Sequence, residues 1–135
     1  MIVLDSSILV GIIKQEQGWE GLLDLLAAED CAIGAPTLVE TRAWCAMNLI
    51  GRSSRWLEDF ITGQGVSIIP FGREMANVAS VAFVTFGRAS GHSAKLNLGD
   101  CLAYAVSTAL RAPLLFKGGA FGQTDVMAHP ASLRL

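Results

Sequence analysis

The chain has 135 residues, of which 52% are apolar and 16% are charged, and its formal net charge is -2. This composition excludes intrinsic disorder, and the length is that of one domain, residues 1–135, which can bury a core without a disulfide or a structural metal. The charge provides no overall basic field, so any nucleic-acid binding has to use a local patch.

The cysteines and the apolar stretches indicate a cellular location. Cys31, Cys45 and Cys101 are odd in number and lack C-x-x-C spacing, which argues against a disulfide framework and a zinc site. We expect reduced, packed thiols and a cytoplasmic protein. From the pattern of its first residues, we expect a strand rather than a signal peptide. The longest uncharged stretch of its second half, residues 75–87, is shorter than the ~20 residues of a membrane span.

Strands and helices alternate along the first half of the chain. The continuous apolar run at residues 2–4 is typical of a central parallel strand covered on both faces, and it ends at Asp5. Pro36 suits the first position of a helix, because its missing N–H needs no partner there. The elements predicted after Asp5 are a helix from residue 8 that fades over 14–17, a helix from about 19 to 29, a strand at 31–35, and helices at 37–50 and 52–62 with Gly51 between them.

The same alternation continues to the end of the chain. The predicted elements are a strand at 66–69, a helix at 73–86, a polar loop at 87–95, a helix at 97–110, a strand at 113–116 and a candidate short edge strand at 124–126. Strands that alternate with helices predict a parallel sheet with right-handed crossovers. We therefore expect an α/β fold.

Three acidic residues occupy comparable places in this pattern. Asp5 ends the first strand, Glu40 lies in the first turns of the helix after the second strand, and Asp100 lies in the first turn of the helix before the last strand. Ligands bind at the carboxyl edge of open α/β sheets, and the helix that holds Asp100 starts at that edge. The three carboxylates can therefore converge although they are far apart in the sequence.

A purely structural role is an alternative for each acid. Asp5 and Asp100 stand where an acidic residue caps a helix or favours its first turn. Glu40 is harder to explain in this way, because an apolar stripe of Ala43, Trp44 and Met47 follows it at helical spacing. A carboxylate on a stripe that faces the core is costly unless it is paired or binds a metal.

Carboxylates without a nearby histidine or cysteine select hard cations, Mg²⁺ or Mn²⁺, which retain several waters. One or two such ions can activate a water, orient it toward a phosphodiester and neutralise the leaving oxygen. Ser6 or Ser7 could position a water or a phosphate oxygen, and helix capping explains them equally well.

Several motifs of the chain resemble one family. They are residues 2–7 (IVLDSS), Glu40 in a helix after a proline-containing turn, residues 96–105 (LNLGDCLAYA) and residues 114–118 (LLFKG). Together they resemble the PIN-domain ribonucleases, and in particular VapC-type toxins of bacterial toxin–antitoxin pairs. The resemblance covers essentially the whole chain, and the Asn-x-Gly-Asp-Cys block is its most specific part.

The resemblance implies a PIN fold, which is a three-layer α/β/α sandwich around a parallel sheet of four to five strands. It implies a Mg²⁺- or Mn²⁺-dependent endoribonuclease, inhibition by a VapB-like antitoxin, and frequent homodimerisation. By position, Asp5 and Asp100 match the metal-binding acids and Glu40 matches the third acid. Relatives commonly have an aspartate at position 120, where this chain has Ala120, so Asp125 is the nearest candidate for a fourth catalytic acid.

The positions of several other side chains suggest candidate roles. Trp44 and Trp56 suit either an interface with a second copy or an antitoxin, or core packing. His92 and His129 lack the spacing of a metal site or a catalytic triad, and no role is predicted for them. The plausible phosphate contacts are Arg42, Arg88, Lys95 and Lys117.

Two alternatives to a ribonuclease follow from the same residues. Ala120 suggests a PIN-fold binding module whose catalysis is attenuated. A Mg²⁺-dependent phosphate-handling domain also has an aspartate after its first strand. However, Ser7 stands where a phosphoaspartyl hydrolase has its second aspartate, and Pro70 begins the segment where a receiver domain has one.

Overall fold

The first strand of the chain lies in the middle of its sheet. Strand β1 (Ile2–Leu4) pairs in parallel with β2 (Cys31–Gly34) on one side and with β4 (Leu114–Leu115) on the other, while β3 (Ser67–Ile69) pairs with β2. The strand order is β3-β2-β1-β4, with every pair parallel. The order places the strand that ends at Asp5 between two neighbours, so its carboxyl end lies at the centre of the sheet edge.

This computed structural model describes residues 1–48 and 53–134. The predicted end of one helix at Ile50 and Gly51, and the predicted start of the next at Arg52, lie outside the described residues. Among the described residues, no helix combines the length and hydropathy needed to cross a bilayer.

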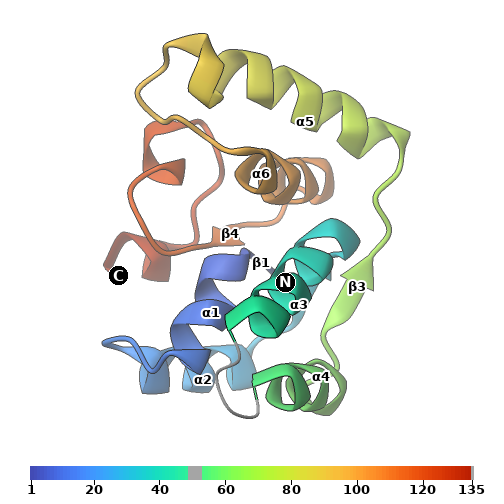
Figure 1. Cartoon of the computed structure of the whole chain (residues 1–135), viewed down its shortest axis with the longest axis vertical. Helices are drawn as coiled ribbons and strands as arrows, with labels where there is room; N and C mark the ends of the chain where they lie inside the picture. The colour runs from blue at the N-terminus through green and yellow to red at the C-terminus, as the bar shows by residue number, and fades with distance from the viewer. Residues whose placement is uncertain (49–52, 135) are drawn as a thin grey trace.

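Helices cover both faces of the sheet (Figure 1). The described residues form α1 (Ser6–Ile13), α2 (Trp19–Ala28), α3 (Ala35–Asn48) and α4 (Ser53–Gly63) on one face, and α5 (Arg73–Phe86) and α6 (Leu98–Leu110) on the other. The predicted three-layer α/β/α sandwich is therefore confirmed.

The side chains of β1 alternate between two hydrophobic cores. Ile2 and Leu4 belong to the core beneath the first four helices, whereas Val3 belongs to the core beneath α5 and α6. All three are fully buried, and Val3 lies opposite Ala32 and Leu114 on the neighbouring strands. A strand buried on both faces needs no polar residue, which explains the continuous apolar run.

The candidate edge strand at residues 124–126 is not formed. The Thr124 hydroxyl donates to the Phe121 carbonyl (2.7 Å) and accepts from the Val126 N–H (3.2 Å), which holds these residues in a turn. The turn follows a short 3-10 helix, η2 (Phe121–Gln123). The backbone pairs with β4 only later, through a single parallel bridge between Ala128 and Leu114.

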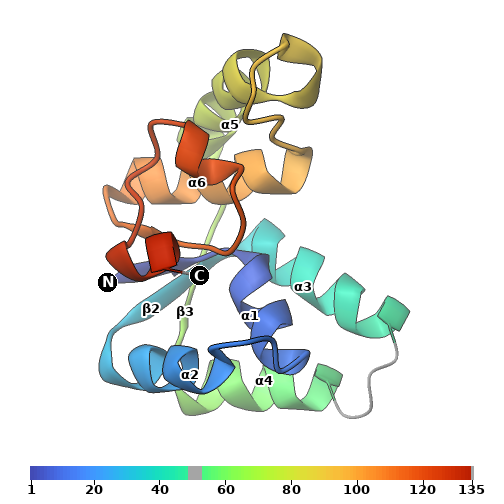
Figure 2. The ribbon, with the colours of Figure 1, turned by 90° about the vertical axis from the view of Figure 1, so that its left-hand side faces the viewer.

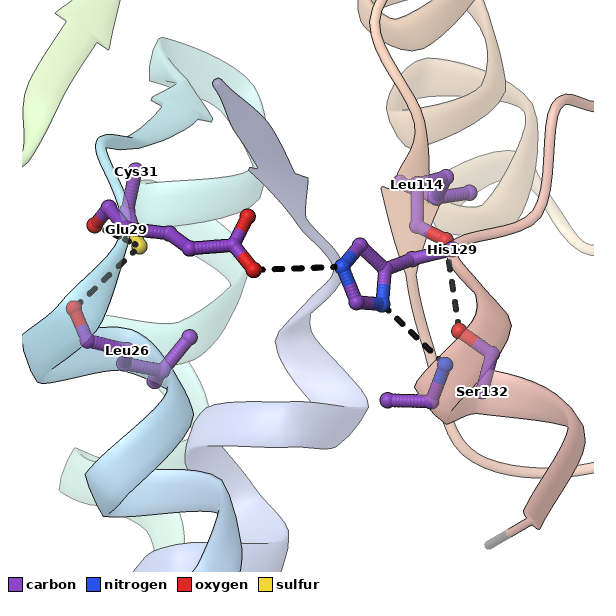
Figure 3. A network of polar contacts seen from close by, with 7 residues as sticks. Leu26, Glu29, Cys31, Leu114, His129 and Ser132 are labelled. Carbon is purple, nitrogen blue, oxygen red and sulfur yellow. Dashed lines mark hydrogen bonds and ion pairs between the residues drawn. The ribbon is translucent and has the colours of Figure 1, made fainter.

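The C-terminal segment is tied to β4 and to the end of α2. The His129 N–H donates to the Leu114 carbonyl (2.9 Å), and the imidazole Nε2 of His129 lies 3.7 Å from the Glu29 carboxylate (Figure 3). Ser132, in the 3-10 helix η3 (Pro130–Arg134), donates to the same carbonyl and accepts from the Phe116 N–H. His129, for which no role was predicted, thus has a structural one.

Strand β2 packs tightly against α6 at Gly34. A Cβ added to Gly34 would lie 2.7 Å from Cγ2 of Val106, which is fully buried. We therefore expect Gly34→Ala to lower the free energy of unfolding by about 1–3 kcal/mol, the usual cost of overpacking a core. Urea denaturation measures this change.

Gly21→Ala is the matched control for this prediction. Gly21 lies in α2, and a Cβ there would meet nothing within 4 Å. This substitution should raise stability by about 0.5–1 kcal/mol, because alanine favours the helix. Equal stability of the two variants would show that β2 and α6 can separate without cost.

Candidate functional site

The beginnings of α1, α3 and α6 lie together at the carboxyl edge of the sheet (Figure 2). Asp5 is the N-cap of α1, Glu40 lies in the second turn of α3, and Asp100 lies in the first turn of α6. The negative charges of Glu40 and Asp100 both act on Asp5 and raise its pKa. The structure thus brings together the three acids that the sequence placed at one edge.

Asp5 is a buried carboxylate held by one serine. Its side chain is only 4% exposed, and its Oδ2 accepts from the Ser7 N–H (3.1 Å) and from the Ser7 hydroxyl (2.5 Å). Burial raises the pKa of Asp5 from 3.8 to about 6, and the hydrogen bonds from Ser7 oppose that rise. Asp5 therefore caps α1 and is also the most buried member of the acidic cluster formed by Asp5, Glu40 and Asp100.

Ser7 also connects the acidic cluster to the end of β4. Its hydroxyl oxygen accepts from the Lys117 N–H (3.0 Å), while the Asp5 N–H donates to the Leu115 carbonyl (3.0 Å). Of the two serines considered for positioning, Ser7 is thus the one that orients Asp5. The Ser6 side chain acts on Glu40 instead and lowers its pKa.

Glu40 lies against the beginning of α6. Its Oε1 is buried and has no hydrogen-bond partner among the described residues. A Cβ built on Gly99 would overlap with the Glu40 carboxylate, so a larger residue at position 99 would force that carboxylate to move. Burial raises the pKa of Glu40, and the charge of Asp100 raises it further. The role of Gly99 was not predicted, although its place in the Asn-x-Gly-Asp block was the signal.

Asp100 forms a capping box with Asn97. The Asn97 side chain accepts from the Asp100 N–H (2.8 Å), and Oδ2 of Asp100 accepts from the Asn97 N–H (3.0 Å). Burial raises the pKa of Asp100, whereas the Asn97 N–H and the Arg88 charge lower it. Asp100 therefore does cap α6, as the alternative interpretation predicted. The cap occupies only Oδ2 and leaves Oδ1 for a ligand.

Asp125 is held at a different place. Its Oδ1 accepts from the Tyr104 hydroxyl (2.5 Å), and burial together with this carboxylate raises the pKa of Tyr104 to about 12. Both residues line a cavity of about 360 Å³ between α5 and α6. Among the described residues, Asp125 makes no contact with Asp5, Glu40 or Asp100. The sequence did not predict that Tyr104 would be the partner of Asp125.

Ala120, the position where a fourth acid was expected, is the N-cap of η2 and packs against the core beneath α5 and α6. A methyl group there offers no ligand atom. With Asp125 held by Tyr104, the described acids at this edge remain Asp5, Glu40 and Asp100.

The predicted phosphate contacts differ in whether they form ion pairs within the protein. Arg42 pairs with Glu58 on α4 (2.5 Å), and Lys117 pairs with Glu16 (3.8 Å). Arg88, in contrast, acts on Asp100. The two tryptophans considered for an interface, Trp44 and Trp56, are half-buried against the core of the first four helices, and the Trp56 ring stacks on Phe60 at 5.1 Å.

The donor atoms at this edge fit a hard divalent cation. All are carboxylate oxygens, and the buried Glu40 Oε1 lacks a partner in the described part of the chain. Over residues 1–48 and 53–134, no group of three acidic, histidine or cysteine side chains is placed to hold a metal ion together. Mg²⁺ commonly binds proteins through only one or two carboxylates and keeps several waters, so it does not need three ligands from the chain.

The chain matches the model of the PIN-domain family over residues 2–126. Ribonuclease VapC28 of Mycobacterium tuberculosis is 35% identical over 130 residues, which cover 93% of this chain and 95% of that protein. Two crystal structures share the fold with a TM-score of 0.73: M. tuberculosis VapC20, a Sarcin-Ricin loop cleaving toxin, and Rickettsia felis VapBC2 bound to a DNA fragment from their promoter. VapC20 is 14% identical and the match covers 93% of this chain and 96% of VapC20, whereas the VapBC2 chain is 19% identical with coverages of 95% and 96%. The chain therefore belongs to the PIN-domain family and, within it, groups with the VapC proteins.

Proposed function

We propose that the protein is a metal-dependent endoribonuclease, the toxin of a toxin–antitoxin pair, in which Asp5, Glu40 and Asp100 hold one or two Mg²⁺ or Mn²⁺ ions. The observation that carries this proposal is the meeting of three carboxylates from separate helices, one of which has a buried oxygen with no hydrogen-bond partner in the described part of the chain. The ribonuclease names of relatives such as VapC28 support the same activity.

The chain's own residues would prepare the site for a phosphodiester. Ser7 fixes the rotamer of Asp5, and Asn97 fixes that of Asp100, so neither carboxylate has to be ordered when an ion binds. Gly99 lets Glu40 approach α6. A bound divalent ion would supply a water of lowered pKa and would neutralise charge on the phosphate.

The partners belong to this proposal as well. R. felis VapBC2 was solved with its promoter DNA, and we propose a VapB-like antitoxin as the partner of this chain, with RNA as its substrate. Homodimerisation is proposed on the same family basis. Three cysteines, all buried as free thiols, agree with the predicted cytoplasmic location.

Cleavage of RNA by the purified, antitoxin-free protein tests the activity. With Mn²⁺ present, the wild-type protein should cut a labelled single-stranded RNA, and Asp100→Asn should reduce the rate on the order of 1,000-fold. Asp125→Asn, the matched control, should retain the wild-type rate. Equal rates for wild type and Asp100→Asn would exclude catalysis at this edge.

Ala120 favours one second candidate, a PIN-fold module that binds its antitoxin but does not cleave RNA. Position 120 offers a methyl group instead of a carboxylate, and Asp125 is hydrogen-bonded to Tyr104. Antitoxin binding without cleavage by the wild type would select this candidate. The phosphate-handling alternative is set aside, because the chain belongs to the PIN-domain family.

A further inference from the structure

We infer that the loop from Gly87 to Leu96, called here the basic loop, contacts the RNA backbone, and that Arg88 binds the phosphate nearest the acidic cluster. The inference rests on the proposed ribonuclease function and names the residue that positions its substrate. Three independent observations carry it: the distribution of charge, the closure of the loop and its position beside α6.

The basic loop carries cations without acids. Its charged residues are Arg88 and Lys95, and it contains no aspartate or glutamate. Both cations are exposed, and within the described residues neither forms an ion pair. Arg42 and Lys117, in contrast, are paired with Glu58 and Glu16. Of the four cations considered for phosphate binding, those in the loop are thus available to a ligand.

The loop is closed at its base by backbone pairing. The Arg88 N–H donates to the Leu96 carbonyl (3.1 Å), and the Leu96 N–H donates to the Phe86 carbonyl (2.9 Å), which forms a bridge between Gly87 and Leu96. Leu96 is fully buried and anchors the end of the loop. Arg88 therefore stands at the fixed base of the loop rather than at its tip.

Side chains within the loop hold its shape. The Ser90 hydroxyl donates to the Gly87 carbonyl (2.6 Å) and accepts from the His92 N–H (3.1 Å), while Nδ1 of His92 accepts from the Ala94 N–H (3.0 Å). The His92 ring also packs edge-on against Phe86 at 5.0 Å. His92 is thus a structural residue of the loop, and little ordering entropy is left to lose when a ligand binds.

The base of the loop lies beside the acidic cluster. Figure 2 shows the chain passing from the end of α5 through this loop directly into the start of α6. Arg88 pairs with Leu96, the residue before Asn97 of the capping box, and its charge acts on Asp100. An RNA strand whose scissile phosphate approaches the acids would place a neighbouring phosphate within reach of this guanidinium.

The chemistry of the two groups matches. A guanidinium binds phosphate through two parallel hydrogen bonds, and it stays charged at any pH at which the protein folds. The three carboxylates repel the RNA backbone, so a cation at their border reduces that repulsion during approach. With a net charge of -2, the chain depends on such a local patch.

RNA binding by Arg88→Gln tests the inference. Affinity for a labelled single-stranded RNA is measured by fluorescence anisotropy over a range of salt concentrations, in the Asp5→Asn background with Mn²⁺ so that the RNA stays intact. Arg88→Gln should weaken binding about five- to tenfold and reduce the slope of log affinity against log salt by about 0.7, the value for one phosphate contact on a single strand.

Two further variants make the result specific. Arg73→Gln removes the same charge from the opposite end of α5, about 20 Å away along the helix, and should leave both the affinity and the slope unchanged. Arg88→Lys should keep the salt slope, because the charge remains. Unchanged melting temperatures will show that all three variants fold.

Failure of the inference is distinguishable from failure of the proposed function. If wild type cleaves RNA but Arg88→Gln binds it with the affinity and slope of Arg73→Gln, Arg88 does not contact the backbone. If Arg88→Gln loses antitoxin binding while its RNA binding is unchanged, the loop docks protein and the inference is wrong. A wild type that neither binds nor cleaves RNA contradicts the proposed function itself.

Discussion

Asp5→Asn should abolish RNA cleavage and yet raise the free energy of unfolding by about 3 kcal/mol at pH 7.5 without divalent cations. The pKa of Asp5 rises from 3.8 to about 6 on folding, and its side chain is 4% exposed. At about 1.4 kcal/mol per pH unit, keeping this carboxylate charged costs the folded state about 3 kcal/mol. Asparagine keeps the acceptor for Ser7 and removes the charge.

The pH dependence has a definite sign. Because the folded-state pKa lies above the unfolded value, the folded protein binds the proton more tightly, and stability falls as the pH rises from about 4 to about 6. Urea denaturation of wild type and Asp5→Asn should therefore give a difference that is small at pH 4 and full at pH 7.5.

Asp24→Asn provides the control for this stability gain. Asp24 is exposed on α2, and its substitution should change stability by less than about 0.5 kcal/mol at either pH. A destabilised Asp5→Asn at pH 7.5 would mean that the charge of Asp5 is compensated in the free protein, and the explanation from burial would be wrong.

Mn²⁺ should raise the melting temperature of the wild type by about 8–11 °C at a concentration about 100 times its dissociation constant. Binding to the folded state alone contributes about 2.7 kcal/mol under that condition, and about 3–4 °C per kcal/mol is expected at this chain length. The physical cause is the relief of repulsion among Asp5, Glu40 and Asp100, whose pKa values are all raised by burial. Differential scanning fluorimetry with and without Mn²⁺ measures the shift.

Two aspartate variants decide where the ion binds. Asp100→Asn should lose most of the Mn²⁺-dependent stabilisation, and Asp125→Asn should keep it, since Asp125 is bonded to Tyr104. The gain should also shrink below pH 6, where protons compete for Asp5. Equal losses in both variants would place Asp125 within the metal site.

The order of the elements could be predicted because local patterns determined it. The apolar run at residues 2–4 indicated a strand buried on both faces, and Val3 and its neighbours are fully buried. The turn at Thr124 could not be predicted in the same way. Its hydroxyl binds backbone groups on both sides, and this short-range competition overrides the β-branched pattern of the segment.

The candidate site was predictable only in part. The positions of Asp5, Glu40 and Asp100 followed from the rule that parallel strands and their helices share one edge. Two contacts depend on how α6 packs, which no local pattern specifies. They are the contact of Glu40 with Gly99 and the hydrogen bond between Tyr104 and Asp125. The ion pair between Arg42 and Glu58 likewise joins two helices, and no local pattern specifies it.

The hydrogen bonds at the end of β4 hold the fold together at residues that precede the segment where a fourth acid was expected. Ser7 and the Asp5 N–H fix the backbone at Lys117 and Leu115, so the chain is anchored before it reaches Ala120. At Gly119 a Cβ would meet no neighbouring atom within 4 Å, so a side chain has room there, whereas Gly118 has a φ of +100°, which strains any other residue. The side chain at position 119 can therefore change without disturbing the anchor at Lys117 and Leu115. Under the proposed ribonuclease function, the chemistry of this segment could therefore change in evolution while the anchored fold persists.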